Sequence, residues 1–148
     1  MEIGEEIFEG TDCAREEGEH KLDTRGPGHN KVMGRRGEEA AVRYLEHMDY
    51  EILDRNWTCP AGEADIVAFD GCTLVFVEVK TRTDISKGLP AEAVDAEKRA
   101  RYEMIAAWYL KDHFIVEVPV RFDVIGLLVV APDRALVRHY VNAFGGGL

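Results

Sequence analysis

The chain has 148 residues, of which 46% are hydrophobic and 31% charged, and this suits one domain with an ordinary hydrophobic core. Its 28 acidic residues outnumber its 18 basic residues by ten, which argues against a protein held on nucleic acid or an anionic membrane by overall charge. No apolar run reaches the roughly 20 residues of a membrane-spanning helix. The acidic start lacks the apolar region of a secretory signal, so we expect a cytoplasmic protein without membrane contact.

The three cysteines suggest neither a metal site nor a disulfide framework. Cys13, Cys59 and Cys72 are far apart, odd in number and without any C-x-x-C spacing. We expect unpaired thiols in a reducing compartment.

Residues 1–33 differ in composition from the rest of the chain. They hold nine acidic and four basic residues, and therefore half of the net charge of −10. Their apolar residues are few and aperiodic, and Gly26-Pro27-Gly28 is expected to break any helix. We predict a disordered acidic extension over residues 1–33 and one domain over residues 34–148. A functional arm is the alternative.

The first element of the domain is predicted to be a helix over residues 34–48. Apolar side chains recur there with helical spacing at Ala41, Tyr44, Leu45 and Met48. Glu38 precedes Ala41 by three residues and lies on the same stripe, which is predicted to face the core.

Strands are predicted over residues 50–58, 63–69 and 73–80. Asp70-Gly71 separates the last two and is a strong signal for a two-residue hairpin turn. A second helix is predicted from Pro90 to about Lys111, with Val94, Ile105 and Trp108 on one stripe. Residues 118–130 and 135–141 are predicted closing strands. The order is αβββαβ with an additional strand, which indicates an α/β fold.

The predicted hairpin gathers ionisable side chains on one face. Side chains alternate along a strand, so Glu78 and Lys80 share a face. A turn at Asp70-Gly71 pairs Glu63 with Glu78 and makes Asp65 a diagonal neighbour of Glu78, with Cβ atoms about 5–8 Å apart. One divalent ion can bridge carboxylates at that distance, whereas an odd-length turn would put Asp65 and Glu78 on opposite faces.

Three acids on a half-buried face require a counter-charge. Lys80 supplies one positive charge, and a hard cation such as Mg²⁺, which takes one or two carboxylates, would supply the rest. Glu38 is a candidate fourth carboxylate, unless it only favours the dipole of its helix. The alternative is that the acids line a solvated sheet edge and Lys80 pairs with Glu78.

Basic residues flank these acids in the sequence. Lys98 lies on a helix line with Arg101 and Ile105, where its ammonium either extends to solvent or contacts a phosphate. Arg99 is expected to pair with Glu103 on the surface. The segments around the site carry Arg35, Arg36, Arg82, Lys87, Lys98 and Arg101. These residues suit phosphate contacts, and dispersed surface charge is the alternative.

The ordered set of motifs over residues 34–144 resembles the YraN-like family of predicted endonucleases. That family belongs to the restriction-endonuclease-like, PD-(D/E)XK superfamily, whose signature is Asp, a gap, and then (Asp/Glu)-x-Lys. The residues that carry the resemblance are Gly34-x-x-Gly37-Glu38, Asn56, Gly62-Glu63-x-Asp65, Phe76-Val77-Glu78-Val79-Lys80-x-Arg82, Lys98, Arg121-Phe122-Asp123 and Asn142-Ala143-Phe144. Ala64 departs from the bulkier aliphatic residue usual between the two acids of the Gly62 motif.

The resemblance implies an αβββαβ core with a mixed β-sheet flanked by helices, and metal-dependent hydrolysis of phosphodiesters with Mg²⁺ or Mn²⁺. It maps Asp65 and Glu78 onto metal-binding positions and Lys80 onto the catalytic lysine. Glu38 matches an acid that archaeal Holliday-junction resolvases place at their metal site. The expected partner is nucleic acid, with DNA first, and a junction substrate would require a homodimer.

Two other functions remain open from the sequence. One is a nucleic-acid-binding module on a nuclease-like scaffold that does not cleave. The other is a scaffold protein with a regulatory acidic tail and no affinity for nucleic acid.

Overall fold

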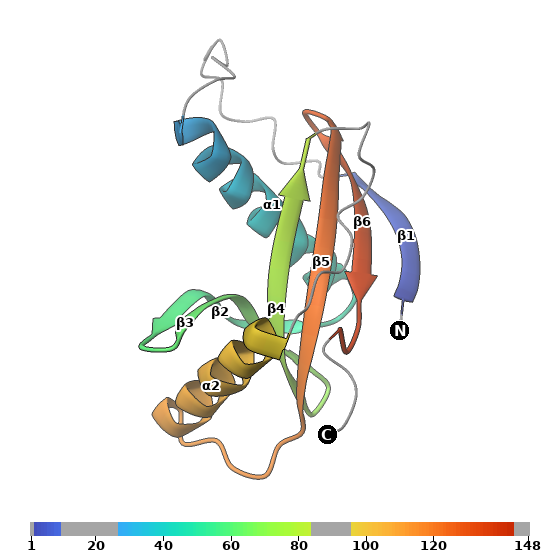
Figure 1. The fold of residues 1–148 in the computed structure, drawn as a ribbon. Helices are drawn as coiled ribbons and strands as arrows, with labels where there is room; N and C mark the ends of the chain where they lie inside the picture. The colour runs from blue at the N-terminus through green and yellow to red at the C-terminus, as the bar shows by residue number, and fades with distance from the viewer. Residues whose placement is uncertain (1, 10–26, 84–95, 144–148) are drawn as a thin grey trace.

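The fold is one mixed β-sheet with a helix on each face (Figure 1). This computed structural model describes residues 2–9, 27–83 and 96–143, with side chains from residue 34 onward. The strands are β1 (Glu2–Glu9), β2 (Glu51–Cys59), β3 (Gly62–Asp70), β4 (Thr73–Arg82), β5 (Val120–Ala131) and β6 (Arg134–Tyr140), and the helices are α1 (Pro27–His47) and α2 (Ala96–Asp112). No helix in the described part of the chain is both long and apolar enough to cross a membrane.

The six strands have the order β1-β6-β5-β4-β3-β2. Only β4 and β5 run parallel, and α2 lies in the connection between them, as a parallel crossover requires. All other neighbours are antiparallel. From α1 onward the order is αβββαβ followed by β6, which confirms the predicted fold class.

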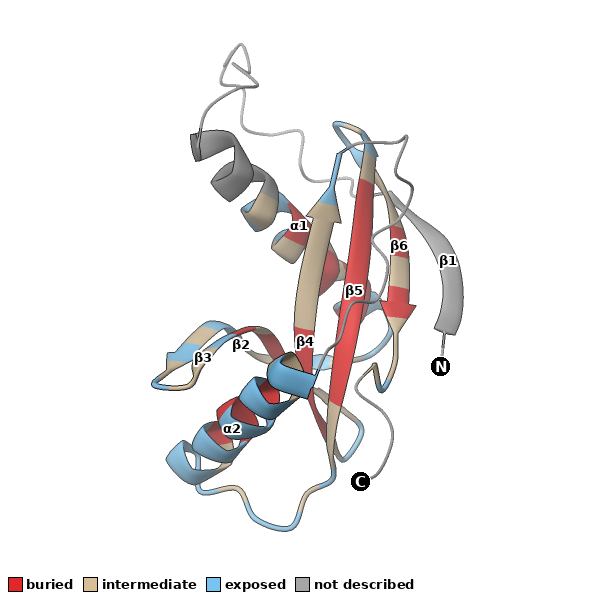
Figure 2. Ribbon diagram, viewed as in Figure 1, coloured by how far each residue is buried: buried red, intermediate tan, exposed pale blue. Residues whose placement is uncertain are grey.

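The alternation along β4 builds two hydrophobic cores. Val75 and Val77 pack against α1 in a core that includes Leu45. Leu74 and Phe76 point to the opposite face and pack against α2. The buried first half of β4 and the buried middle of β5 are therefore covered on both faces (Figure 2). This burial explains why residues 74–77 of β4 and 124–130 of β5 are runs without a polar side chain.

The N-terminal residues differ from their expectation. Residues 2–9 form a strand that pairs with β6, and α1 begins at Pro27 rather than at Gly34. Pro27 and Gly28 therefore lie in the first turn of α1 and do not interrupt it, because a proline at the start of a helix leaves no hydrogen bond unmade by its missing N–H. The rest of the predicted extension, residues 10–26, lies outside the described residues.

The buried face of α2 is rotated from its prediction. Ile105 is fully buried as expected, but Trp108 is 37% exposed, and the helix buries Tyr102 and Tyr109 instead. Tyr102, Ile105, Ala106 and Tyr109 have the helical spacing i, i+3, i+4 and i+7, so the signal was present in the sequence and the predicted stripe did not use it. The predicted helix start at Pro90, and Val94 with it, lies outside the described residues.

Candidate functional site

The hairpin between β3 and β4 turns one residue later than its sequence predicts. Asp70 pairs with Thr73, so the turn residues are Gly71 and Cys72. Gly71 has a φ of +59°, which glycine adopts without strain at the first position of a type II′ turn. The predicted turn at Asp70-Gly71 and the register that followed from it are therefore wrong.

The corrected register keeps the acids on one face. Moving the turn by one residue shifts the pairing by two, so no side chain changes face. The last pair of the ladder is Ile66 with Val77. One further step in the same register sets Asp65 opposite Glu78, where the sequence predicts a diagonal pair. The prediction that Glu63 lies opposite Glu78 is wrong. Glu63 pairs with Thr58 of β2.

The strands β3 and β4 separate next to these acids. Beyond the last ladder pair, β3 stays paired with β2 and β4 stays paired with β5. Figure 1 shows the β2–β3 hairpin turned away from the long β4 and β5 strands. At the fork the backbone N–H of Val79 donates a hydrogen bond to Asp65 Oδ2 over 2.8 Å. The Asp65 carboxylate therefore accepts a hydrogen bond from the backbone of β4 at the point where the pairing of β3 with β4 ends.

Asp65 lies among acids from three elements. Burial raises the pKa of Asp65 to about 6, against the Val79 hydrogen bond, and the negative charges of Glu38, Glu78 and Glu63 raise it further. These neighbours come from α1, β4 and β3. The fold thus concentrates negative charge around one half-buried carboxyl group.

Glu78 has one satisfied and one unsatisfied oxygen. Lys98 Nζ lies 2.6 Å from Glu78 Oε1, and the two side chains are only 19% and 17% exposed. Glu78 Oε2 is buried without a hydrogen-bond partner among the described residues. Lys98 thus contacts a carboxylate, which neither of its predicted roles anticipated. Lys80 lies two residues beyond Glu78 on the same face of β4 and is half-buried.

A glycine brings α1 close to the end of β4. A Cβ atom at Gly37 would overlap Thr81 Oγ1 and crowd the Cβ and Cγ2 of the same threonine. The Cβ of Thr81 would itself lie only 3.0 Å from the added atom, and rotation of the threonine side chain does not move that Cβ. Only glycine permits this approach, and Glu38 follows it directly in α1.

The carboxylates at the fork fit a hard divalent cation. Within residues 34–83 and 96–143, no group of three or more Asp, Glu, His or Cys side chains is arranged to hold a metal ion. Asp65 and Glu78 nevertheless provide the one or two carboxylates that Mg²⁺ takes when waters and phosphate oxygens complete its shell. Glu78 Oε2, which has no hydrogen-bond partner among the described residues, is an oxygen that a cation would bind.

Of the predicted phosphate-binding residues, Arg35, Arg36, Arg82 and Lys98 lie on segments that meet near this fork, and Lys87 lies outside the described residues. Arg35 and Arg36 are exposed on α1, and Arg82 is exposed at the end of β4. The contact between Gly37 and Thr81 brings these two segments together. Arg99, by contrast, pairs with Glu103 at 3.5 Å, and the predicted surface pair is confirmed.

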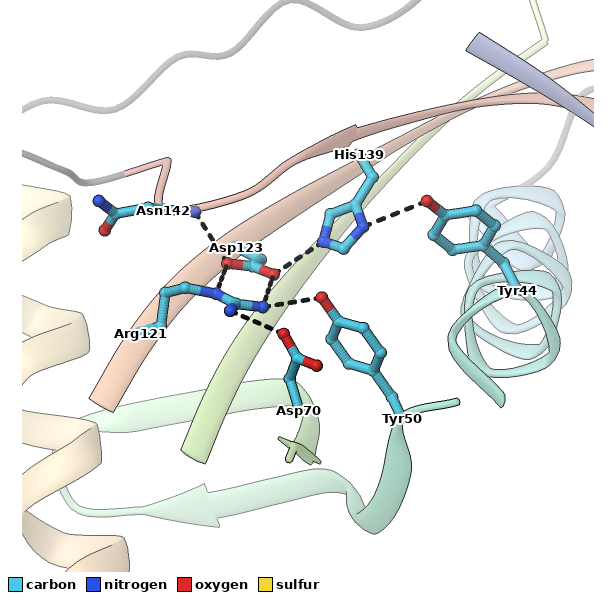
Figure 3. Close-up of polar contacts among 7 residues, drawn as sticks. All are labelled: Tyr44, Tyr50, Asp70, Arg121, Asp123, His139 and Asn142. Carbon is cyan, nitrogen blue, oxygen red and sulfur yellow. Dashed lines mark hydrogen bonds and ion pairs between the residues drawn. The ribbon is translucent and has the colours of Figure 1, made fainter. Parts of the chain in front are cut away.

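A second polar cluster lies on the other face of the sheet and was not predicted as a unit (Figure 3). Asp123 is beside Val77 in the sheet and, like it, faces α1. It accepts hydrogen bonds from Arg121 Nε over 2.9 Å and from the backbone N–H of Asn142 over 2.9 Å, and it lies 2.7 Å from His139 Nε2. Burial would raise the pKa of Asp123, but the contacts with His139 and Arg121 lower it below its usual value.

This cluster joins β5 and β6 to other elements of the fold. Arg121 also donates to Asp70 Oδ2 over 2.9 Å and to the Tyr50 hydroxyl over 2.7 Å. Tyr44 Oη of α1 lies 3.2 Å from His139 Nδ1. The motif Arg121-Phe122-Asp123 was the available signal, because alternation puts its two charged residues on one face. Nothing in the sequence marks His139.

Comparison with known proteins identifies the family. The model of the uncharacterised protein family UPF0102 matches residues 37–127. A UPF0102 protein of Geobacter sulfurreducens is 46% identical over 119 residues, which cover 80% of this chain and 93% of the relative. A UPF0102 protein of Rhodococcus jostii is 41% identical over 116 residues, covering 78% and 98%, and one of Beutenbergia cavernae is 47% identical over 108 residues, covering 73% and 92%. The chain therefore belongs to the YraN-like family UPF0102.

Proposed function

We propose that this protein is a divalent-metal-dependent endonuclease that hydrolyses phosphodiester bonds in nucleic acid, with DNA as its substrate. The observation that carries the proposal is the group of carboxylates at the fork between β3 and β4. Asp65 has its pKa raised to about 6 by burial and by three surrounding acids, and one buried oxygen of Glu78 has no hydrogen-bond partner among the described residues. Such a group is unfavourable without a cation and suits one well.

In this proposal Asp65 and Glu78 hold Mg²⁺ or Mn²⁺, and Glu38 adds negative charge from α1. A bound cation of this kind polarises the phosphodiester, activates a water and neutralises the developing charge. The hydrogen bond from Val79 fixes one oxygen of Asp65 and so orients the carboxylate.

Lys80 is the proposed catalytic lysine. It shares the face of Glu78 on β4, from which its ammonium would orient the attacking water or stabilise charge on the phosphate. The exposed Arg35, Arg36 and Arg82 would hold the flanking phosphates, together with Lys98. A junction substrate would need two such sites and therefore a homodimer.

The alternative is a module that binds nucleic acid on the same scaffold without cleaving it. A protein that only binds nucleic acid has no need for half-buried carboxylates beside its binding surface, because carboxylates repel the phosphates. The presence of Asp65, Glu78 and Lys80 together therefore favours cleavage.

The test is a cleavage panel with purified full-length protein. Duplex, single-stranded, flap and junction DNA, and RNA, are incubated with Mg²⁺ or Mn²⁺. We expect metal-dependent cleavage of at least one DNA substrate, abolished by Asp65→Asn and Glu78→Gln and reduced about 100-fold or more by Lys80→Met. Glu103→Gln, which removes a surface acid of α2, serves as the control and should cleave like the unaltered protein.

Two results would contradict the proposal. One is the absence of metal-dependent cleavage on every substrate. The other is cleavage that survives Glu78→Gln, which would point to a contaminating nuclease. If the protein binds nucleic acid without cleaving it, and Lys80→Met leaves this binding unchanged, the result would support the non-cleaving module instead.

A further inference from the structure

The ion pair between Lys98 and Glu78 joins α2 to the candidate site. Lys98 is the third residue of α2, and its ammonium nitrogen lies 2.6 Å from Glu78 Oε1. Both side chains are more than four-fifths buried, so solvent screens this pair less than a surface ion pair. The other oxygen of Glu78 is buried without a hydrogen-bond partner in the part of the chain that is described.

In this arrangement the Lys98 ammonium and the proposed divalent ion compete for the Glu78 carboxylate. Glu78 is also a proposed ligand of the divalent ion, and the Lys98 ammonium already contacts that carboxylate. A divalent ion beside Glu78 would lie within a few ångströms of the ammonium, where like charges repel strongly in a partly buried site. The affinity for the metal therefore depends on where the Lys98 ammonium lies.

We propose that Lys98 is a positioning residue that exchanges partners, neutralising Glu78 when no metal is bound and moving to a phosphate of the nucleic acid when the metal enters. The proposal rests on the cation site proposed above. It deepens that function by coupling the two ligands. The metal alone binds weakly because Lys98 opposes it, and nucleic acid strengthens metal binding because it gives the ammonium another anion.

The first test measures Mn²⁺ affinity of the full chain without nucleic acid, by electron paramagnetic resonance of the free ion. Lys98→Gln removes the charge but retains a donor for Glu78, so the carboxylate is not left buried without a partner. We expect this variant to bind Mn²⁺ about tenfold more tightly than the unaltered protein. Lys98→Arg keeps the charge and should retain the original affinity.

The control is Arg99→Gln, the same loss of one positive charge at the next residue of α2. Arg99 pairs with Glu103 rather than with Glu78, so its loss should leave Mn²⁺ affinity unchanged. Adding Glu78→Gln to Lys98→Gln should abolish the gain. Circular dichroism establishes that each variant is folded before the titration.

The outcomes separate this proposal from the proposed function. If Glu78→Gln abolishes Mn²⁺ binding but Lys98→Gln does not strengthen it, the exchange is wrong and the cation site stands. If Mn²⁺ binding is the same in the unaltered protein and in Glu78→Gln, the cation site is wrong and the exchange with it.

The second test measures the coupling itself. A short duplex DNA with non-hydrolysable phosphorothioate linkages is added before the Mn²⁺ titration. We expect Mn²⁺ affinity of the unaltered protein to rise about fivefold or more, within the usual range of coupling between ligands. The rise should be much smaller in Lys98→Gln. An equal rise in both proteins would overturn the exchange.

Discussion

Asp65, which is half-buried, and Asp123, which is fully buried, illustrate how neighbours decide the charge of a carboxyl group. Asp65 and Asp123 both lie in the sheet, on opposite faces. Burial and surrounding acids raise the pKa of Asp65 to about 6, whereas His139 and Arg121 lower the pKa of Asp123 despite its burial. Asp123 is thus stabilised as an anion by the protein itself. For Asp65 the hydrogen bond from Val79 opposes burial and the surrounding acids but does not offset them, which suits the proposed role of Asp65 as a metal ligand.

The first prediction concerns the stability of metal-free Asp65→Asn. Because the pKa of Asp65 is higher in the folded protein than in the unfolded chain, ionising Asp65 lowers the free energy of unfolding. This decrease develops as the pH rises from about 4 through about 6. Asparagine removes the charge and can still accept the hydrogen bond from Val79. With EDTA present, we expect Asp65→Asn to raise the free energy of unfolding by about 1 to 3 kcal/mol near pH 8.

Urea denaturation at several pH values measures this effect. The gain from Asp65→Asn should shrink as the pH falls from about 6 and disappear only below about pH 3, where the aspartate is protonated in both the folded and the unfolded state. Asp123→Asn is the matched comparison and should destabilise the protein by roughly 3 to 5 kcal/mol, because it leaves buried partners unpaired. A gain from Asp65→Asn that does not depend on pH would contradict this account of the charge.

The two helices end with the same backbone motif. At the end of α1, Asp49 has a φ of +66°, and the N–H of Tyr50 donates to the carbonyl of Leu45 over 2.9 Å. At the end of α2, Phe114 has a φ of +54°, and the N–H of Ile115 donates to the carbonyl of Leu110 over 3.0 Å. Both are Schellman motifs, in which glycine is the preferred residue at the left-handed position.

The second prediction follows from the poor fit of phenylalanine to that position. Phe114 is 91% exposed, so its removal loses little burial, and glycine adopts the left-handed conformation without strain. We expect Phe114→Gly to raise the free energy of unfolding by about 1 kcal/mol. Val116→Gly is the control, since Val116 is 79% exposed but does not have a positive φ.

Thermal or urea unfolding of the two variants side by side decides the point. Val116→Gly should be neutral or destabilising. Equal effects from Phe114→Gly and Val116→Gly would show that the left-handed conformation at Phe114 does not strain the fold.

The elements with local signals were predictable, and those that depend on tertiary contacts were not. Alternation in β4 and the Asp70-Gly71 signal located the hairpin, and the shift of its turn preserved the face of Asp65 because strand side chains alternate with a period of two. The sequence could not show that Lys98 reaches Glu78. That contact depends on how α2 packs across the sheet.

The charge of the whole molecule is unevenly distributed along the chain. Residues 1–26 hold nine acidic and three basic residues. Residues 27–148 hold 19 acidic and 15 basic residues, and four of those acids are Glu38, Glu63, Asp65 and Glu78. Without these four, the charges of residues 27–148 balance. The net charge therefore does not argue against a local basic surface around the fork.

The third prediction concerns the acidic segment. Deleting residues 1–26 should strengthen DNA binding several-fold at low salt, because the segment repels phosphates, and the gain should fade as salt screens the charges. Deleting residues 1–33 would cut into α1, and deleting β1 also uncovers the edge of β6.

A second variant separates charge from structure. It keeps β1 and neutralises the acids at Asp12, Glu16, Glu17, Glu19 and Asp23 with the corresponding amides. Fluorescence anisotropy with a labelled duplex should give a similar gain for both variants. If neither variant binds more tightly at low salt, the segment does not influence nucleic-acid binding.

Asp65 and Glu78 are proposed to form one site for a divalent cation. Crystals grown with Mn²⁺ and measured near the manganese absorption edge test it directly. We predict an anomalous difference peak in contact with both carboxylates, and a Lys98 ammonium that has moved away from Glu78. Crystals with Mn²⁺ at other positions, no peak between Asp65 and Glu78, and an unchanged Lys98–Glu78 ion pair would contradict it.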